Sequence, residues 1–167
     1  AAHPARGRRR GADGHHRLSL ILTLAGLFGA AFLAATVIPF ASEPVLVGLQ
    51  LAGLAPVWLL VVVASVGNTL GTLVNYWLGW RLESAGAHRW LRVSEVRFAQ
   101  AQGWWARWGL WSLLLSWLPL GGVLTVVAGA MRTPLGVFLA LVALAKTGRY
   151  VVLALVTSVI LVMGRDL

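Results

Sequence analysis

The sequence predicts an all-α, polytopic integral membrane protein with two Pro/Gly-broken re-entrant hairpins in inverted-repeat halves. Composition is the first reason, because 59% of the residues are hydrophobic, 11% are charged and the mean hydropathy is +0.80. An average soluble domain has about a quarter of its residues charged, so this chain has too few charges to cover a soluble surface. The second reason is that long apolar runs are interrupted by prolines, and this pattern occurs twice.

The first 17 residues differ from the rest of the chain. They are polar and rich in arginine, which predicts a disordered basic arm over 1–17 and a single membrane domain over 18–167. The arm contains His3, His15 and His16, but no second group of ligands accompanies them, so we predict no metal site. Basic residues beside apolar runs favour contact with anionic lipid headgroups and not with nucleic acid. The absence of cysteine excludes disulfides and thiolate metal sites.

A broken apolar region follows the arm. The run Leu18–Ile38 has the ~20 residues that a spanning helix needs, and a signal peptide is the alternative interpretation. Pro39 and Pro44 then forbid a continuous helix, and the arm 45–53 after them is too short to span. Glu43 stands in this break. It is either a loop residue in water or a carboxylate at membrane depth, where a charge is costly and often marks a pathway.

The next apolar run, Val57–Trp80, is long enough to cross the membrane. Gly67 and Gly71 are four residues apart, which allows another helix to approach closely. Asn68 and Asn75 need hydrogen-bond partners inside a helix bundle. Both asparagines therefore serve either as packing contacts or as neutral groups of a site.

The stretch 81–107 has the pattern of a helix lying in the membrane interface, with apolar residues on one side and basic residues on the other. We expect Gly103 to break or bend it. Its five arginines against two acidic residues predict a cytoplasmic location. The same rule places the arm 1–17 in the cytoplasm, which requires an even number of crossings between the two segments. The repeat gives one crossing unless the run 18–38 spans fully, so the sequence leaves this topology open.

The second half contains another broken apolar region and a long final helix. The run Leu110–Met131 is interrupted by Pro119, and the final helix is expected over 135–163. Lys146 and Arg149 lie near the middle of that helix and, being three residues apart, on one face. Two cations in an apolar segment either reach toward an interface or pair with carbonyl groups, or they belong to a site.

The two halves are similar to each other. Each has an apolar arm, a Pro break, a short arm ending in Ala-Gly, a second Pro and a long helix with a polar triplet. The matching positions are Pro39 and Pro119, Gly53 and Gly129, Pro56 and Pro134, and Asn68 and Lys146. We therefore predict repeat 1 over about 18–80 and repeat 2 over about 108–163. Inverted repeats with broken segments are typical of transporters, whose site lies near the midplane.

These motifs resemble the DedA superfamily of membrane proteins, which carry the VTT or SNARE-associated domain, and most closely its short YqaA-type branch. The matching pieces are Pro39-Phe-Ala-Ser-Glu43, Gly67-Asn68-Thr69-Leu70-Gly71, Ser116-Trp-Leu-Pro119 with Ala128-Gly129, and Ala145-Lys146-Thr-Gly-Arg149-Tyr150. The resemblance implies two re-entrant hairpins and a role in moving lipids between leaflets, including the polyprenyl-phosphate carrier and phospholipids. It also implies that Glu43 matches the functional acidic residue of the first re-entrant loop.

The second loop departs from the family pattern. The main DedA branch has two arginines around the proline that matches Pro119, and this chain has none there. The YqaA-type branch often has an acidic residue after that proline, where this chain has Gly121-Gly122.

Together these observations predict a translocator of lipids or lipid phosphates in the cell membrane, with anionic or phosphate-bearing lipids as partners and no cofactor. The expected site residues are Glu43, Lys146, Arg149, Asn68 and Thr147, in which the cations attract phosphate and Glu43 pairs with Lys146 or Arg149. The alternatives are a secondary carrier of a small ion or solute and a non-transporting membrane organiser. We expect no enzyme, because the sequence has no nucleophile–base pair, metal-ligand cluster or phosphate-binding Gly-rich loop.

Overall fold

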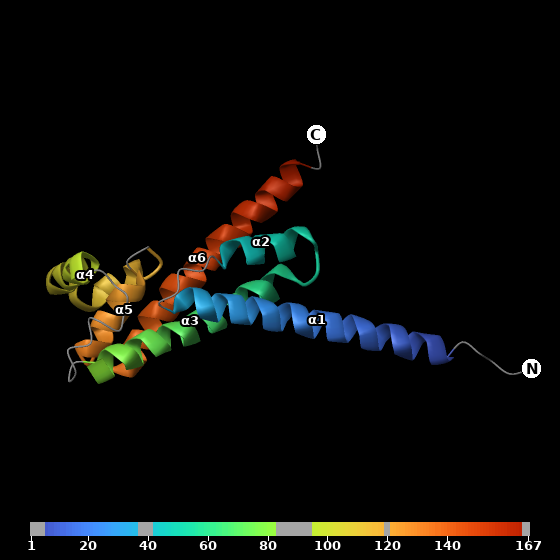
Figure 1. Cartoon of the computed structure of the whole chain (residues 1–167). Coiled ribbons are helices and arrows are strands. Elements are labelled where there is room, and N and C mark those ends of the chain that lie inside the picture. The colour runs from blue at the N-terminus through green and yellow to red at the C-terminus, as the bar shows by residue number, and fades with distance from the viewer. Residues whose placement is uncertain (1–5, 37–41, 83–94, 119–120, 165–167) are drawn as a thin grey trace, which may run out of the picture.

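The computed structural model describes residues 6–36, 42–82, 95–118 and 121–164, and helices account for most of them (Figure 1). The elements are α1 (Arg6–Ala35), α2 (Glu43–Leu51), α3 (Val57–Leu82), α4 (Glu95–Trp108), the 3₁₀ helix η2 (Gly109–Leu115), α5 (Gly121–Ala130) and α6 (Leu135–Met163). Three segments in this part of the chain are long and apolar enough to cross a membrane, namely Arg17–Ala35, Val57–Arg81 and Leu135–Met163. The prediction of an all-α, polytopic membrane fold is confirmed.

Glycine and proline set most helix boundaries. After α2 ends, Gly53 adopts a φ of 62°, a left-handed conformation that glycine tolerates at a helix end. Pro56 and Pro134 immediately precede α3 and α6, whose predicted starts are confirmed. The expected break at Gly103 does not occur, because α4 continues through it and ends before Gly109, which has a φ of 53°.

The amino-terminal arm also differs from expectation. We predicted disorder over 1–17, but α1 is helical from Arg6 onward. Arginine and alanine are good helix formers, and a helix already nucleated in the apolar run extends at little cost. The polar segment therefore continues the helix of the apolar run Arg17–Ala35.

Helices α1 and α3 run parallel and touch through glycines. A Cβ atom at Gly67 would stand 2.7 Å from the carbonyl oxygen of Phe28, and one at Gly71 would collide with the carbonyl oxygen of Phe32. One turn further on, Asn75 Nδ2 donates a hydrogen bond to the carbonyl oxygen of Ala35 at the end of α1 (2.8 Å). The predicted close contact at these glycines and the bundle partner of Asn75 are both confirmed.

The packing of the short helices agrees with the predicted repeat. Gln50 at the end of α2 donates hydrogen bonds to the Ala154 carbonyl oxygen (3.0 Å) and to Ser158 Oγ (2.9 Å) on α6. Near the end of α5, a Cβ atom at Gly129 would collide with the backbone of α3 at Tyr76. The matching prolines Pro56 and Pro134 are 78 residues apart. With this offset Gln50 matches position 128 and Ala154 matches position 76, so the contact of Gly129 with Tyr76 is nearly the repeat equivalent of the contact of Gln50 with Ala154. Each short helix thus packs on the long helix of the other half. That either hairpin is re-entrant stays a prediction.

The buried core lies where the two halves meet, and the outside is apolar. Leu27, Leu46, Leu60 and Tyr150 are fully or almost fully buried among α1, α2, α3 and α6. A second cluster, with Leu113, Ala128, Phe138 and Val142, joins η2, α5 and α6. Large apolar side chains such as Ile21, Leu22, Val152 and Leu155 are exposed on α1 and α6. Such surfaces are expected of helices that face lipid.

Helix α4 packs by its apolar side against α5. Ala101 is fully buried and Trp105 partly buried against Leu124 and its neighbours, whereas Trp108 is 58% exposed. The predicted apolar side is thus confirmed for Ala101 and Trp105. Much of the stretch 81–107 lies outside the described residues, so its predicted location in the interface stays a prediction.

The parallel arrangement of α1 and α3 bears on the two basic segments. The basic start of α1 lies at the end of the bundle where α3 begins, and α3 ends at the other end, close to α5 (Figure 1). The span Val57–Arg81 is long enough to cross the membrane, and a single crossing by α3 would place the helical part of the arm and Arg81 on opposite sides. The cytoplasmic location of each basic segment stays a prediction, and such a crossing would allow it for only one of the two.

Candidate functional site

The site centres on an ion pair between the two halves of the chain. Arg149 Nη2 on α6 lies 2.5 Å from Glu43 Oε1, at the first residue of α2. A carboxylate is favoured at that position, because the amino-terminal end of a helix carries partial positive charge. The predicted proximity of Glu43 to Lys146 or Arg149 is confirmed for Arg149.

Arg149 also reaches the second break. Its Nη1 donates a hydrogen bond to the carbonyl oxygen of Trp117 (3.1 Å), in the segment between η2 and α5. A backbone carbonyl outside a helix needs a donor at membrane depth, and the guanidinium supplies one. The same side chain thus links the breaks that precede α2 and α5.

The depth of this ion pair follows from the helix that carries it. Arg149 stands fourteen residues from each end of α6, or about 21 Å along the axis at 1.5 Å per residue. The side chain of Arg149 is therefore attached at the middle of a helix that is long enough to span the membrane. The side chains are 37% exposed for Arg149 and 27% for Glu43, so the pair is not sealed inside the protein.

Tyr150 is a hydrogen-bonding centre beside the ion pair. Its hydroxyl lies 2.7 Å from Ser42 Oγ and accepts a hydrogen bond from Asn68 Nδ2 (2.8 Å). The tyrosine is 1% exposed. These bonds connect α6 to α3 and to the residue that precedes Glu43, and they fix the start of α2 relative to α6.

Lys146 adds a second positive charge to the site. It precedes Tyr150 by one helical turn, is 7% exposed, and lies close enough to Glu43 and Arg149 for their charges to interact. A buried ammonium group is stabilised by a nearby carboxylate. The described part of the site thus holds two cations and one carboxylate, which leaves a net positive charge.

The structure brings together four of the five predicted site residues. Glu43, Lys146 and Arg149 form the charged group, and Asn68 joins them through Tyr150. Thr147 is half-buried, is turned by about 100° from Lys146 on the helix, and takes no part in the hydrogen bonds that join the cluster.

Sequence reasoning missed two members of the cluster. Tyr150 and Ser42 carry its central hydrogen bonds. Tyr150 lies four residues after Lys146, on the same helical face, and this spacing was the signal that could have identified it. Ser42 is marked only by its position beside Glu43. No group of three potential metal ligands occurs in the ranges that the structure describes.

Comparisons with known proteins agree with this architecture. The VTT domain model matches residues 19–159. The chain is 40% identical to the inner membrane protein YqaA of Escherichia coli (strain K12) over 141 residues, which cover 84% of this chain and 94% of that protein. It is 31% identical to an uncharacterized protein of Haemophilus influenzae over 149 residues, covering 81% and 88% of the two chains. No solved structure matches significantly. The chain therefore belongs to the VTT-domain, or DedA, family as a YqaA-type protein, and is a multi-pass protein of the cell membrane.

Proposed function

We propose that this protein moves phosphate-bearing lipids from one leaflet of the membrane to the other. The observation that carries the proposal is the position of Arg149, which sits at the middle of α6 and binds both Glu43 and the Trp117 carbonyl group. A charged headgroup crosses hydrocarbon only at a cost of many kcal/mol. A polar site at mid-depth between two broken segments reduces that cost, while the acyl chains remain in lipid.

The ion pair supplies a mechanism of exchange. A guanidinium binds a phosphate through two parallel hydrogen bonds, as it binds a carboxylate. In the unloaded protein Glu43 pairs with Nη2 of Arg149 while Nη1 binds the Trp117 carbonyl oxygen, which prevents an unpaired charge at membrane depth. An arriving phosphate displaces Glu43, and Lys146 adds attraction as a point charge. When the lipid leaves, Glu43 returns to Arg149 and the cycle can repeat.

The test is a leaflet-exchange assay with purified protein in vesicles. Lipids carrying a fluorophore on one chain are placed in both leaflets, and an impermeant reductant removes the fluorescence of the outer leaflet. We expect the protein to accelerate exchange of lipids with phosphate headgroups over that of a phosphate-free glycolipid. Arg149→Gln should abolish the acceleration. Arg107→Gln, which removes an exposed charge from α4, should preserve it.

The outcomes separate the functions considered. Equal exchange of the lipids with and without phosphate would remove phosphate recognition from the proposal. No exchange by folded protein would favour an organiser that binds partners.

A small-ion carrier is the second candidate, because Glu43 is a carboxylate that could bind a proton or cation when it leaves Arg149. It would dissipate an imposed ion gradient across the vesicle membrane without exchanging lipids. That measurement uses the same vesicles with an ion-sensitive dye inside.

A further inference from the structure

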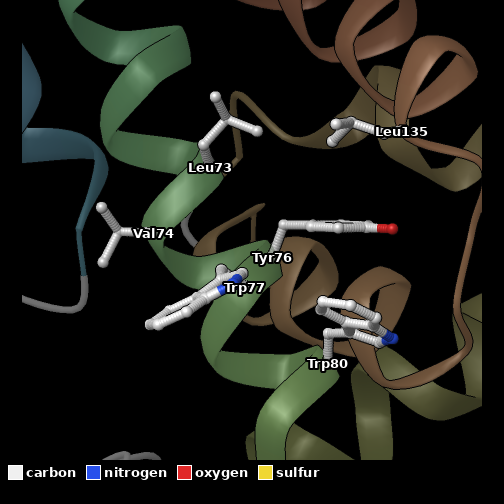
Figure 2. A pocket seen from close by; sticks show the side chains of 6 residues that line it. All are labelled: Leu73, Val74, Tyr76, Trp77, Trp80 and Leu135. Carbon is white, nitrogen blue, oxygen red and sulfur yellow. The ribbon is translucent and has the colours of Figure 1, made fainter.

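An apolar groove lies far from the ion pair, where the end of α3 meets the start of α6. It has a volume of about 640 Å³ and is lined by Leu73, Val74, Tyr76, Trp77, Trp80 and Leu135. Figure 2 shows the rings of Tyr76 and Trp80 one above the other, with Leu135 on the opposite wall. Leu135 is separated from Arg149 by fourteen residues of α6, about 21 Å, so the groove is not part of the central site.

The walls of the groove are held in place by close contacts behind them. Tyr76 donates its hydroxyl proton to the carbonyl oxygen of Thr133 (2.5 Å), and its ring packs on Phe138 with 4.5 Å between centroids. Behind α3, Gly79 and Gly129 allow the backbones of α3 and α5 to touch. The Tyr76 wall of the groove is therefore fixed by the fold, and its ring is not free to collapse into the groove.

Positive charge borders this apolar surface. The guanidinium of Arg81 lies over the ring of Trp77, with Cζ 4.3 Å from the ring centroid. Arg132 is exposed in the turn between α5 and α6 and adjoins Thr133, the hydrogen-bond partner of Tyr76. Arg132 has a φ of 52°, a left-handed conformation that costs energy for any residue other than glycine. The turn thus has a cation at a position where glycine would be less strained.

The groove also lies at a defined depth. Arg81 is the last residue of the candidate span Val57–Arg81, and Trp77 and Trp80 occupy its last turn and a half. Tryptophan and arginine at the end of a spanning helix mark the boundary between hydrocarbon and headgroups. From this boundary the apolar walls face the acyl chains, and the two arginines stand at the level of the phosphates.

We propose that this groove binds an anionic glycerophospholipid of the surrounding bilayer, with one acyl chain against Tyr76, Trp80 and Leu135 and the phosphate beside Arg81 and Arg132. The occupant follows from complementarity of both parts, since an apolar chain fits the lining and a phosphate fits the bordering charges. The site is independent of leaflet exchange at Arg149. It holds a lipid of one leaflet at the place where α3, α5 and α6 meet.

Native mass spectrometry of the full-length protein in detergent tests this proposal. Dioleoyl phosphatidylglycerol and dioleoyl phosphatidylcholine are titrated separately, and the dissociation constant of the first bound lipid is measured. An arginine near the surface contributes about 1 kcal/mol to binding anionic lipid, so Arg81→Gln should weaken phosphatidylglycerol binding about fivefold. Combining it with Arg132→Asn should weaken phosphatidylglycerol binding about 30-fold. Asparagine is chosen because it also tolerates the left-handed conformation. Binding of phosphatidylcholine should change less.

Filling the groove gives a second, independent readout. Leu135→Trp should weaken binding of both lipids, because its indole ring occupies the space of an acyl chain. If Leu135→Trp does not fold, Val74→Trp is tested in its place. The matched controls are Arg107→Gln on α4 and Val152→Trp on the exposed face of α6. Loss of binding in the controls equal to that in the test variants would overturn the proposal, as would undiminished binding when the groove is filled.

Discussion

Asn68 donates a hydrogen bond to the hydroxyl group of Tyr150 over 2.8 Å, and so joins the long helices of the two halves beside the ion pair. Asn68 and Lys146 occupy matching positions of the repeat, and Tyr150 lies one turn after Lys146. The polar triplets that the sequence repeats are thus brought to one place.

Tyr150→Phe should lower the free energy of unfolding by about 1–2 kcal/mol, because it leaves buried polar groups of Asn68 and Ser42 without a partner. The measurement is unfolding in mixed micelles followed by circular dichroism. Asn68→Val alone should also destabilise the protein, while the double variant should lose less than the sum of the two. Strict additivity would show that the hydrogen bond contributes nothing.

Gly129→Ala should destabilise the protein by about 1–3 kcal/mol or more, because the new methyl group collides with the backbone of α3 at Tyr76. Gly26→Ala is the control, since a Cβ atom there meets nothing within 4 Å. This control should instead gain about 0.5–1 kcal/mol from better helix propensity. Thermal unfolding of both variants in the same detergent distinguishes them, and equal stability would contradict the close packing of α3 and α5.

Arg149→Lys should retain part of the leaflet exchange that Arg149→Ala loses. Lysine keeps the charge but lacks the planar fork that holds two oxygen atoms, and a hydrogen bond between charged groups is worth about a tenfold change or more. Lys146→Ala should slow exchange less. Each variant is first checked for folding by size-exclusion chromatography, because loss of folded protein would indicate a purely structural arginine. Full exchange by folded Arg149→Ala would remove this residue from the mechanism.

A single crossing of the membrane by α3, which runs parallel to α1, predicts labelling of the two basic segments from different sides. The chain has no native cysteine, so Gln102→Cys on α4 and Arg17→Cys on α1 can be labelled individually. We expect an impermeant maleimide to reach position 102 from the cytoplasm and position 17 from outside. Labelling of both positions from the same side would contradict a single crossing by α3.

The sequence was sufficient for the long helices because their boundaries depend on local chemistry. Proline before α3 and α6 and glycine after α2 act within a turn, and length alone identifies a spanning segment. The ion pair of Glu43 and Arg149 was predictable for a different reason: charges at membrane depth require partners, and few candidates were available.

Tertiary relationships were less accessible. Nothing local determines that α1 lies parallel to α3, so the sequence alone could not decide whether the two basic segments lie on the same side of the membrane. Tyr150 was not assigned to the site because its hydrogen-bond partners come from segments 82 and 108 residues away, which the sequence does not place beside it. Helix formation over Arg6–Arg17 depended on continuation from an adjoining helix, which composition does not reveal.

The glycine contacts of α3 have a mechanical consequence. Backbone touches backbone where α3 meets α1 at Gly71 and where it meets α5 at Gly79, so no layer of side chains is available there to slide or rotate. Helix α6 instead meets α3 through side chains, including the hydrogen bond between Asn68 and Tyr150, which can break and re-form. Helix α3 is thus held against α1 and α5 by backbone contacts, and under the proposed lipid translocation a tilt of α6 with α2 would turn the central charges from one side of the membrane toward the other.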